Sequence, residues 1–141
     1  MNFLVLNGPN LNLLGEREPD TYGTQSLDEL HAELEAAFPD AALSFFQSNH
    51  EGALLDRLHE ARSADGIVFN PGGFTHTSVA LRDAVAALDV PVIEVHLSNV
   101  SAREDFRRRS LVAPACAGQI SGLGCAGYHL ALTHFRASIV E

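Results

Sequence analysis

The chain contains no lysine and no tryptophan, and only one methionine, two cysteines and two tyrosines occur among its 141 residues. Without lysine, no side-chain amine is available to form a Schiff base with a carbonyl substrate. Cys116 and Cys125 match neither a metal-binding spacing nor a redox motif, so we expect two free, buried thiols in a reducing compartment.

Long hydrophobic runs are also absent. No apolar segment approaches the roughly 20 residues of a membrane-spanning helix, and no basic segment precedes Asn2-Phe3-Leu4 as in a signal peptide. We therefore expect no membrane partner and a cytoplasmic location. With 46% hydrophobic and 19% charged residues, the composition is that of a soluble globular protein, and the length predicts one domain over residues 1–141.

Positive charge is scarce and unevenly placed. The formal net charge of −9 argues against a nucleic-acid partner, because phosphate neutralisation needs a basic face. All nine basic residues are arginines, and four of them fall within seven positions: Arg103, Arg107, Arg108 and Arg109. In an acidic protein such a cluster indicates either an oligomer interface or a pocket for a small anion, and the sequence leaves both open.

Short β-like runs alternate with helical patterns along the chain, as is typical of a parallel α/β sheet. Strands are expected at residues 2–6, 42–47, 66–70, 91–96 and, more weakly, 119–121. Helices are expected from Ser26 onward, where Ser26-Leu-Asp-Glu29 is a capping box, and at 52–62, 77–88 and 127–140, with a short arginine-rich helix after the fourth strand. This alternation predicts a flavodoxin-like five-stranded parallel sheet of order 2-1-3-4-5 with helices on both faces.

In open sheets of this type, ligands bind beyond the carboxyl ends of the strands. Polar side chains follow each of the first four predicted strands. They are Asn10, Arg17 and Tyr22; Asn49 and His50; Asn70 and His76; and Glu94, His96, Ser98 and Asn99. Their convergence predicts a functional site at this rim.

The segment after the first strand, NGPNLNLLGEREPDTYG (residues 7–23), sets Arg17 five residues before Tyr22 on a Gly- and Pro-containing loop. A phenol has an ordinary pKa of about 10, and a guanidinium within about 4–6 Å lowers the pKa of an acid by one to three units. Tyr22 is therefore a candidate general base. The alternative is that both are surface residues of a polar loop. Tyr128, the other tyrosine, opens the last predicted helix and fits the core or an interface.

The segment after the third strand, NPGGFTHTS (residues 70–78), contains two adjacent glycines before a predicted helix. Glycines allow a tight turn that leaves backbone amides free for a carboxylate or phosphate. The alternative is an ordinary strand-to-helix turn in which Thr77 or Ser78 caps the helix. Asn70 and His76 favour ligand binding, because a cap needs neither side chain.

Glu94 and His96 are two residues apart on the fourth predicted strand. Because successive side chains of a strand point to opposite faces, these two point to the same face of the sheet. A carboxylate beside an imidazole orients the ring and favours its protonated form, which gives a general acid near neutral pH. The alternatives are a structural polar pair and, ranked lower, a zinc site with His76, since the paired histidine spacing of common hydrolytic sites is missing.

Several long blocks of the sequence resemble the type II 3-dehydroquinate dehydratases in the same order along nearly the whole chain. They are NGPNLNLLGEREPDTYG at 7–23, QSNHEG at 47–52, NPGGFTHTSVALRDA at 70–84, EVHLSN at 94–99, AREDFRR at 102–108 and GLGCAGYHLAL at 122–132. Departures from the family pattern are confined to residues 111–125, at Leu111, Cys116 and Cys125.

The resemblance implies elimination of water from 3-dehydroquinate to give 3-dehydroshikimate through an enolate, a step of the shikimate and quinate pathways. Tyr22 would remove the C2 proton and Arg17 would stabilise the tyrosinate. Asn10 would hold a water against the enolate oxygen. His96, oriented by Glu94, would protonate the departing C1 hydroxyl.

The resemblance also implies the substrate contacts and the assembly. The residues that would bind the substrate carboxylate and ring hydroxyls are Asn70, His76, Leu97, Ser98 and Arg107. Asp83 would reach the site of a neighbouring subunit in a homododecamer built from trimers. Neither a metal nor an organic cofactor is implied, and the small-molecule substrate is the expected partner.

Two other classes of function remain as alternatives. A flavodoxin-like module could bind FMN or a nucleotide phosphate at residues 70–78, although few aromatic rings are available to flank a flavin. A catalytically silent member could bind a similar acid or serve only in assembly, which the intact set of Arg17, Tyr22, Glu94 and His96 argues against.

Overall fold

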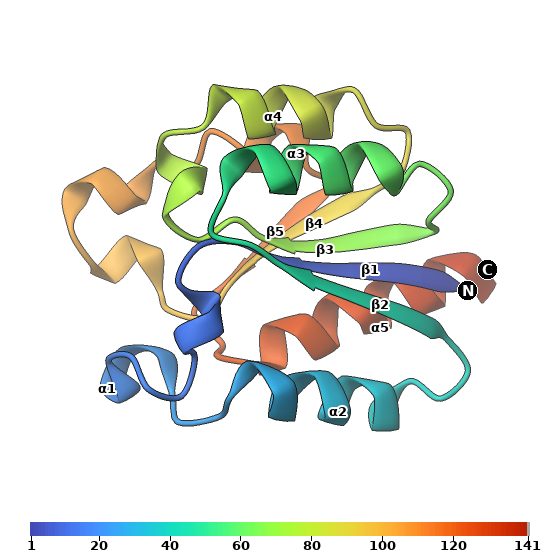
Figure 1. Cartoon of the computed structure of the whole chain (residues 1–141), viewed down its shortest axis with the longest axis horizontal. Helices are drawn as coiled ribbons and strands as arrows, with labels where there is room; N and C mark the ends of the chain where they lie inside the picture. Colours follow the sequence, from blue (N-terminus) through green and yellow to red (C-terminus); the bar gives the residue numbers. More distant parts are fainter. Residues whose placement is uncertain (141) are drawn as a thin grey trace.

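A computed structural model describes residues 1–140 and contains one parallel five-stranded sheet (Figure 1). The strands are β1 (Asn2–Asn7), β2 (Ala42–Gln47), β3 (Gly66–Asn70), β4 (Val92–His96) and β5 (Gly118–Ser121). Their order in the sheet is β2-β1-β3-β4-β5, and every neighbouring pair is parallel. The predicted strand order and the α/β class are confirmed.

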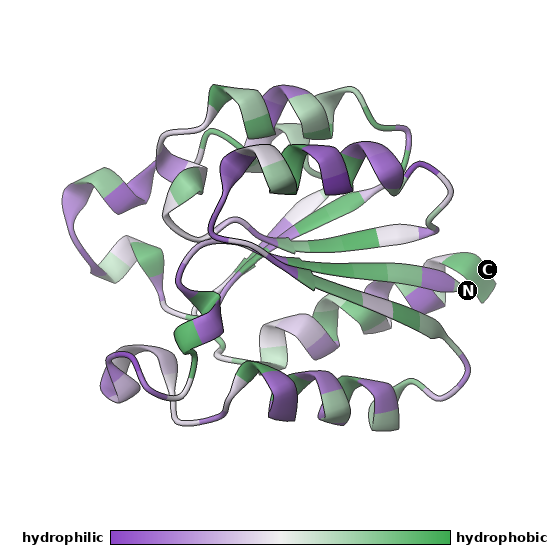
Figure 2. Ribbon diagram, in the orientation of Figure 1, coloured by the Kyte–Doolittle hydropathy of each residue, from purple (hydrophilic) through white to green (hydrophobic). Residues whose placement is uncertain are grey.

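The helices cover both faces of the sheet, as predicted. Helices α2 (Leu27–Ala37) and α5 (Ala126–Val140) lie on one face, and α3 (Glu51–Glu60) and α4 (Val79–Ala86) lie on the other (Figure 1). Strand β1 sends Phe3 and Val5 into the first layer and Leu4 and Leu6 into the second, and all four are buried. Figure 2 accordingly shows hydrophobic strands between helices that are polar on their outer sides.

Two helices begin where the sequence places a capping hydroxyl. The Ser26 hydroxyl accepts a hydrogen bond from the Glu29 amide at 3.1 Å, and the Ser78 hydroxyl accepts one from the Leu81 amide at 2.9 Å. Each bond satisfies one of the free amides of a first turn. Ser78, rather than Thr77, is thus the cap of α4.

The loops contain short helical segments that the sequence pattern did not predict. They are the 3₁₀ turns Leu11–Leu13, Gly72–His76 and Ala113–Ala115, together with the four-residue helix α1 (Pro19–Tyr22). The predicted arginine-rich helix is instead two separate 3₁₀ turns, Val100–Ala102 and Asp105–Arg108. Such segments are too short to show a 3.6-residue hydrophobic period. Within residues 1–140, no helix combines the length and the hydropathy needed to cross a bilayer.

Candidate active site

A cavity of about 150 Å³ opens beyond the carboxyl ends of β1, β3 and β4. Every predicted site residue lines it except Glu94 and Asp83. The predicted site residues that line the cavity are Asn10, Arg17, Tyr22, Asn70, His76, His96, Leu97, Ser98 and Arg107. Pro9, Leu11, Gly72, Gly73, Val100 and Arg103 complete the wall. The loops after three different strands therefore build one cavity.

The Tyr22 ring lies close to two guanidinium groups. The Cζ atom of Arg17 is 4.5 Å from the centre of the Tyr22 ring, and the Cζ atom of Arg103 is 5.3 Å from it. Arg103 also donates a hydrogen bond from Nη1 to the Ser98 hydroxyl at 3.1 Å, which fixes its position beside β4. Both guanidinium groups therefore lie within cation–π distance of the Tyr22 ring.

Arg103 is the site residue that sequence reasoning missed. It belongs to the arginine cluster of residues 103–109, but nothing in its spacing distinguishes it from its neighbours. The structure divides this cluster. Arg103 and Arg107 line the cavity, whereas the Arg108 side chain is 64% exposed and lies 3.7 Å from the Asp105 carboxylate.

Tyr128 cannot act as the base, because its side chain is fully buried and burial raises its pKa far above the ordinary value. Its hydroxyl instead accepts a hydrogen bond from Asn70 Nδ2 at 2.9 Å and donates one to Asn7 Oδ1 at 2.6 Å. Asn70 Oδ1 accepts a bond from the Gly72 amide at 3.0 Å. The Asn70 side chain is thus largely engaged within the protein.

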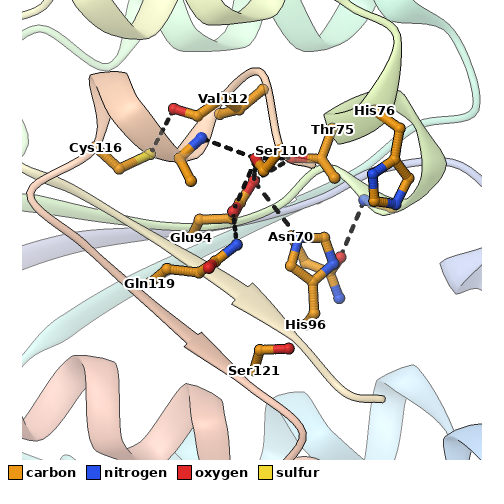
Figure 3. Close-up of polar contacts among 12 residues, drawn as sticks. Asn70, Thr75, His76, Glu94, His96, Ser110, Val112, Cys116, Gln119 and Ser121 are labelled. Atoms are coloured by element: carbon orange, nitrogen blue, oxygen red, sulfur yellow. Dashed lines mark hydrogen bonds and ion pairs between the residues drawn. The ribbon is translucent and has the colours of Figure 1, made fainter. Parts of the chain in front are cut away.

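Behind the cavity, the Glu94 carboxylate is fully buried (Figure 3). It accepts hydrogen bonds from the Thr75 hydroxyl, the Gln119 amide and the Ser110 hydroxyl, the last at 2.9 Å. Burial alone would raise the pKa of Glu94, but His96, with Thr75 and Ser110, favours the ionised form and holds that pKa below 4.5. Glu94 is therefore a carboxylate at neutral pH.

His96 is 6% exposed and lies directly in front of this carboxylate. Its Nε2 is 3.5 Å from Glu94 Oε1, and among residues 1–140 this nitrogen makes no aligned hydrogen bond. The distance suits an ion pair when the imidazole is protonated. Glu94 and His96 share one side of β4, as the strand alternation predicts, and this pair can hold a proton at the cavity wall.

His76 lies across from His96 with its ring centre 6.5 Å away (Figure 3). Its Nδ1 is 2.8 Å from the Arg109 carbonyl oxygen. A carbonyl only accepts, so Nδ1 carries the proton and Nε2 of the neutral ring is left as an acceptor for a ligand hydroxyl.

The glycine turn differs from the sequence-based expectation. Residues 72–76 form a 3₁₀ turn, and α4 begins only after its Ser78 cap. The Gly72 amide is already bonded to the Asn70 side chain, so it is not free for an anion. Gly73 lies at the cavity wall and has no atom within 4 Å of the position that a Cβ would occupy.

Asn10 has a positive φ of 69°, and its backbone amide donates to Asn49 Oδ1 at 2.9 Å. This left-handed conformation turns the chain after β1 and places Asn10 at the cavity. On the other side, the Leu97 and Ser98 carbonyls accept bonds from the Gly124 amide and the Ser121 hydroxyl. The Leu97–Ser98 segment is thereby fixed by the last residue of β5 and by the loop that follows it.

Asp83 lies outside the cavity. It is exposed on α4, where its carboxylate pairs with Arg82 at 2.8 Å. Asp83 therefore does not line the cavity of its own subunit. Its role in the site of a neighbouring subunit stays a prediction.

The zinc alternative is not favoured by the donor geometry. Among residues 1–140, no three His, Cys, Asp or Glu side chains are grouped to hold a metal ion. Protein donors already surround the Glu94 carboxylate, and His76 Nδ1 is engaged with a carbonyl.

The chain is similar to known proteins in family, sequence and structure. Residues 1–136 match the family model described as Dehydroquinase class II. The 3-dehydroquinate dehydratase of Bacillus licheniformis is 61% identical over 137 residues, covering 95% of this chain and 94% of the relative. The 3-dehydroquinate dehydratase 2 of Pseudomonas aeruginosa is 59% identical over 136 residues, covering 94% and 91%. The crystal structure of a type II dehydroquinase from Butyrivibrio crossotus superposes with a TM-score of 0.94 at 45% identity, covering 96% of this chain and 97% of that one.

Proposed function

The chain belongs to the class II dehydroquinase family, and we propose that it is a hydro-lyase that converts 3-dehydroquinate into 3-dehydroshikimate. One observation carries the chemistry: a tyrosine flanked by two arginines and a histidine backed by a buried carboxylate line the same cavity. A base and an acid in one cavity meet the two demands of a dehydration, namely removal of a proton next to a ketone and protonation of a poor leaving group.

In the first step, the Tyr22 phenolate takes the C2 proton of the substrate, and the electron pair of that C–H bond forms an enolate with the C3 carbonyl. Arg17 and Arg103 favour the phenolate by the charge they place beside its ring. Asn10 holds a water molecule against the enolate oxygen, which stabilises the developing charge.

In the second step, the enolate electron pair returns to form the C1–C2 double bond, and the C1–O bond breaks. His96 donates a proton to the departing hydroxyl, which leaves as water. Glu94 stabilises the imidazolium before transfer and keeps the ring oriented, because its carboxylate is ionised and fixed by three protein donors. A proton then passes from Tyr22 to His96 to restore the starting state.

Substrate binding uses the remaining groups at the wall. The Leu97–Ser98 segment and Asn70 bind the carboxylate, and His76 Nε2 accepts a hydrogen bond from a ring hydroxyl of the substrate. Arg107 supplies a guanidinium at the cavity while paired with Glu104 at 3.0 Å. Of the two arginines of the cluster that line the cavity, Arg107 thus serves the substrate, whereas Arg103 lies beside Tyr22.

The wider setting is proposed on the same grounds. We expect a cytoplasmic enzyme of the shikimate or quinate pathway that needs no metal or organic cofactor. We also expect a homododecamer built from trimers, in which the exposed Asp83 reaches the active site of a neighbouring subunit.

The proposal is tested by adding 3-dehydroquinate to the purified chain and following the ultraviolet absorbance of the conjugated enone. We expect steady growth of this absorbance without added metal or cofactor. A folded preparation that gives no signal would contradict the proposal and favour a silent member of the family. Borohydride added during turnover should trap no substrate adduct on a side chain, because the chain has no lysine.

A further inference from the structure

A chain of hydrogen bonds runs from the core to the cavity wall. It joins the Gly72 amide to Asn70 Oδ1 at 3.0 Å, Asn70 Nδ2 to the Tyr128 hydroxyl at 2.9 Å, and that hydroxyl to Asn7 Oδ1 at 2.6 Å. Tyr128 and Asn7 are fully buried and Asn70 is 3% exposed. This series of hydrogen bonds links the ends of strands β1 and β3 to the first turn of helix α5.

The direction of these bonds is fixed by chemistry. A backbone amide can only donate, so the atom of Asn70 that faces Gly72 must be the oxygen. The amide nitrogen of Asn70 therefore faces Tyr128 and donates to it. The single hydroxyl proton of Tyr128 then goes to Asn7 Oδ1. Asn70 is held from both ends and cannot rotate its amide without breaking two bonds.

The amide nitrogen of Asn70 has two protons, and Tyr128 uses one of them. Among residues 1–140, the other proton has no partner, and Asn70 lines the cavity. It is therefore available to a ligand in the cavity. We propose that Tyr128 is a positioning residue, which holds the Asn70 amide so that its second proton meets the substrate.

This inference rests on the proposed function, because the ligand it invokes is the 3-dehydroquinate carboxylate. Its physical basis is independent of the reaction. Burying a hydroxyl is unfavourable unless it is hydrogen-bonded, so Tyr128 provides a polar contact at a core position that a phenylalanine of the same shape could fill. Removing the hydroxyl leaves both asparagines with an unpaired buried group and frees the Asn70 amide to turn.

The test is a double-mutant cycle on kcat and KM for 3-dehydroquinate, with the wild type, Tyr128→Phe, Asn70→Ala and the double variant. We expect Tyr128→Phe to raise KM about tenfold, as for loss of one hydrogen bond to a charged group, while kcat changes less than about threefold. In the Asn70→Ala background, Tyr128→Phe should raise KM no further. An unchanged KM in Tyr128→Phe, or equal effects in both backgrounds, would overturn the proposal.

Two further variants separate positioning from loss of stability. Phe3→Leu removes packing from the same core cluster without touching the hydrogen-bonded chain, and its KM should equal that of the wild type. Asn7→Ala removes the acceptor at the far end and should raise KM in the same direction as Tyr128→Phe. It is the variant of choice if Tyr128→Phe does not fold. A normal KM in Asn7→Ala would contradict the proposal.

Hydrogen exchange of the Gly72 amide provides a measurement that needs no substrate. Tyr128→Phe should accelerate this exchange at least about tenfold relative to Phe3→Leu, because Asn70 Oδ1 is no longer held against the amide. If the wild type shows no turnover, the proposed function fails while this readout still decides the role of Tyr128. Equal exchange rates of the Gly72 amide in Tyr128→Phe and Phe3→Leu would overturn the positioning role of Tyr128.

Discussion

Arg103 places its guanidinium carbon 5.3 Å from the centre of the Tyr22 ring, although the two residues belong to loops that follow different strands. Arg17, from the same loop as Tyr22, lies at 4.5 Å. The Tyr22 ring therefore has one positive charge from its own loop and one from a distant loop close to it. The distance between Arg103 and the Tyr22 ring is therefore set by how the loops after β1 and β4 pack against each other.

The first prediction concerns that distant charge. Arg103→Met keeps the length of the side chain and removes its charge, and we expect kcat to fall about 100-fold, because about 2–3 kcal/mol of stabilisation of the phenolate is lost. Steady-state kinetics measure the effect. Arg108→Met is the matched control from the same cluster, since Arg108 is exposed and does not line this cavity. Equal losses in both variants would show that Arg103 acts only through general electrostatics.

The second prediction separates the side chain of Asn10 from its backbone conformation. With φ at 69°, this position accommodates glycine without strain. Asn10→Gly should therefore lower kcat about tenfold with little change in Tm, whereas Asn10→Ala should lower kcat equally and also cost about 1 kcal/mol of stability. Kinetics and thermal melts of the two variants check this. If Asn10→Gly turns over at the wild-type rate, the Asn10 side chain has no role in the mechanism.

The third prediction concerns the pH dependence of stability. Because the folded pKa of Glu94 lies below its ordinary value of 4.5, the ionised carboxylate stabilises the fold. This contribution is fully present above the unfolded pKa and is lost as the pH falls through the folded pKa. The free energy of unfolding of Glu94→Gln should therefore differ most from that of the wild type near neutrality, and the difference should shrink below about pH 5.

Urea denaturation at a series of pH values measures this difference. The exposed carboxylate of Glu60 provides the control variant, Glu60→Gln. Curves for Glu94→Gln and the wild type that stay parallel from neutral to acid pH would show that Glu94 is not held ionised by the fold.

The fourth prediction concerns Cys116. Burial and the nearby negative charge of Glu94 raise the pKa of this thiol to about 12. At pH 8 about one thiol in ten thousand is then ionised, so alkylation by iodoacetamide should be about a thousandfold slower than in the urea-unfolded chain. Mass spectrometry of labelled peptides follows the rate. Cys116 is only partly buried, although the sequence suggested a buried thiol. Rapid labelling of Cys116 in the folded protein would contradict the raised pKa of this thiol.

Sequence patterns predicted the sheet order and the side chains that follow the strands, because both depend on local regularities. The spacing of two residues between Glu94 and His96 on β4 sufficed to predict that their side chains lie side by side. Likewise, the capping serines Ser26 and Ser78 marked where two helices begin.

The remaining features depend on contacts between distant segments. The approach of Arg103 to Tyr22 requires the loops after β1 and β4 to fold against each other, and no local period encodes it. The donors around Glu94 come from the segment 72–76, the loop at Ser110 and strand β5. The Gly72 amide, expected to be free for an anion, donates to Asn70 Oδ1, and Asn70 Nδ2 donates in turn to the hydroxyl of the distant Tyr128 on α5.

The proposed mechanism depends above all on Tyr22 as the base, and Tyr22→Phe tests this role most directly. The variant keeps the ring close to Arg17 and Arg103 and removes only the hydroxyl. Turnover of 3-dehydroquinate, followed by enone absorbance, and substrate binding, followed by calorimetry, should be measured on the same preparation. We predict that kcat falls at least about a thousandfold while Kd stays within about threefold of the wild type. Turnover near the wild-type rate would contradict the account and assign the proton abstraction to another group.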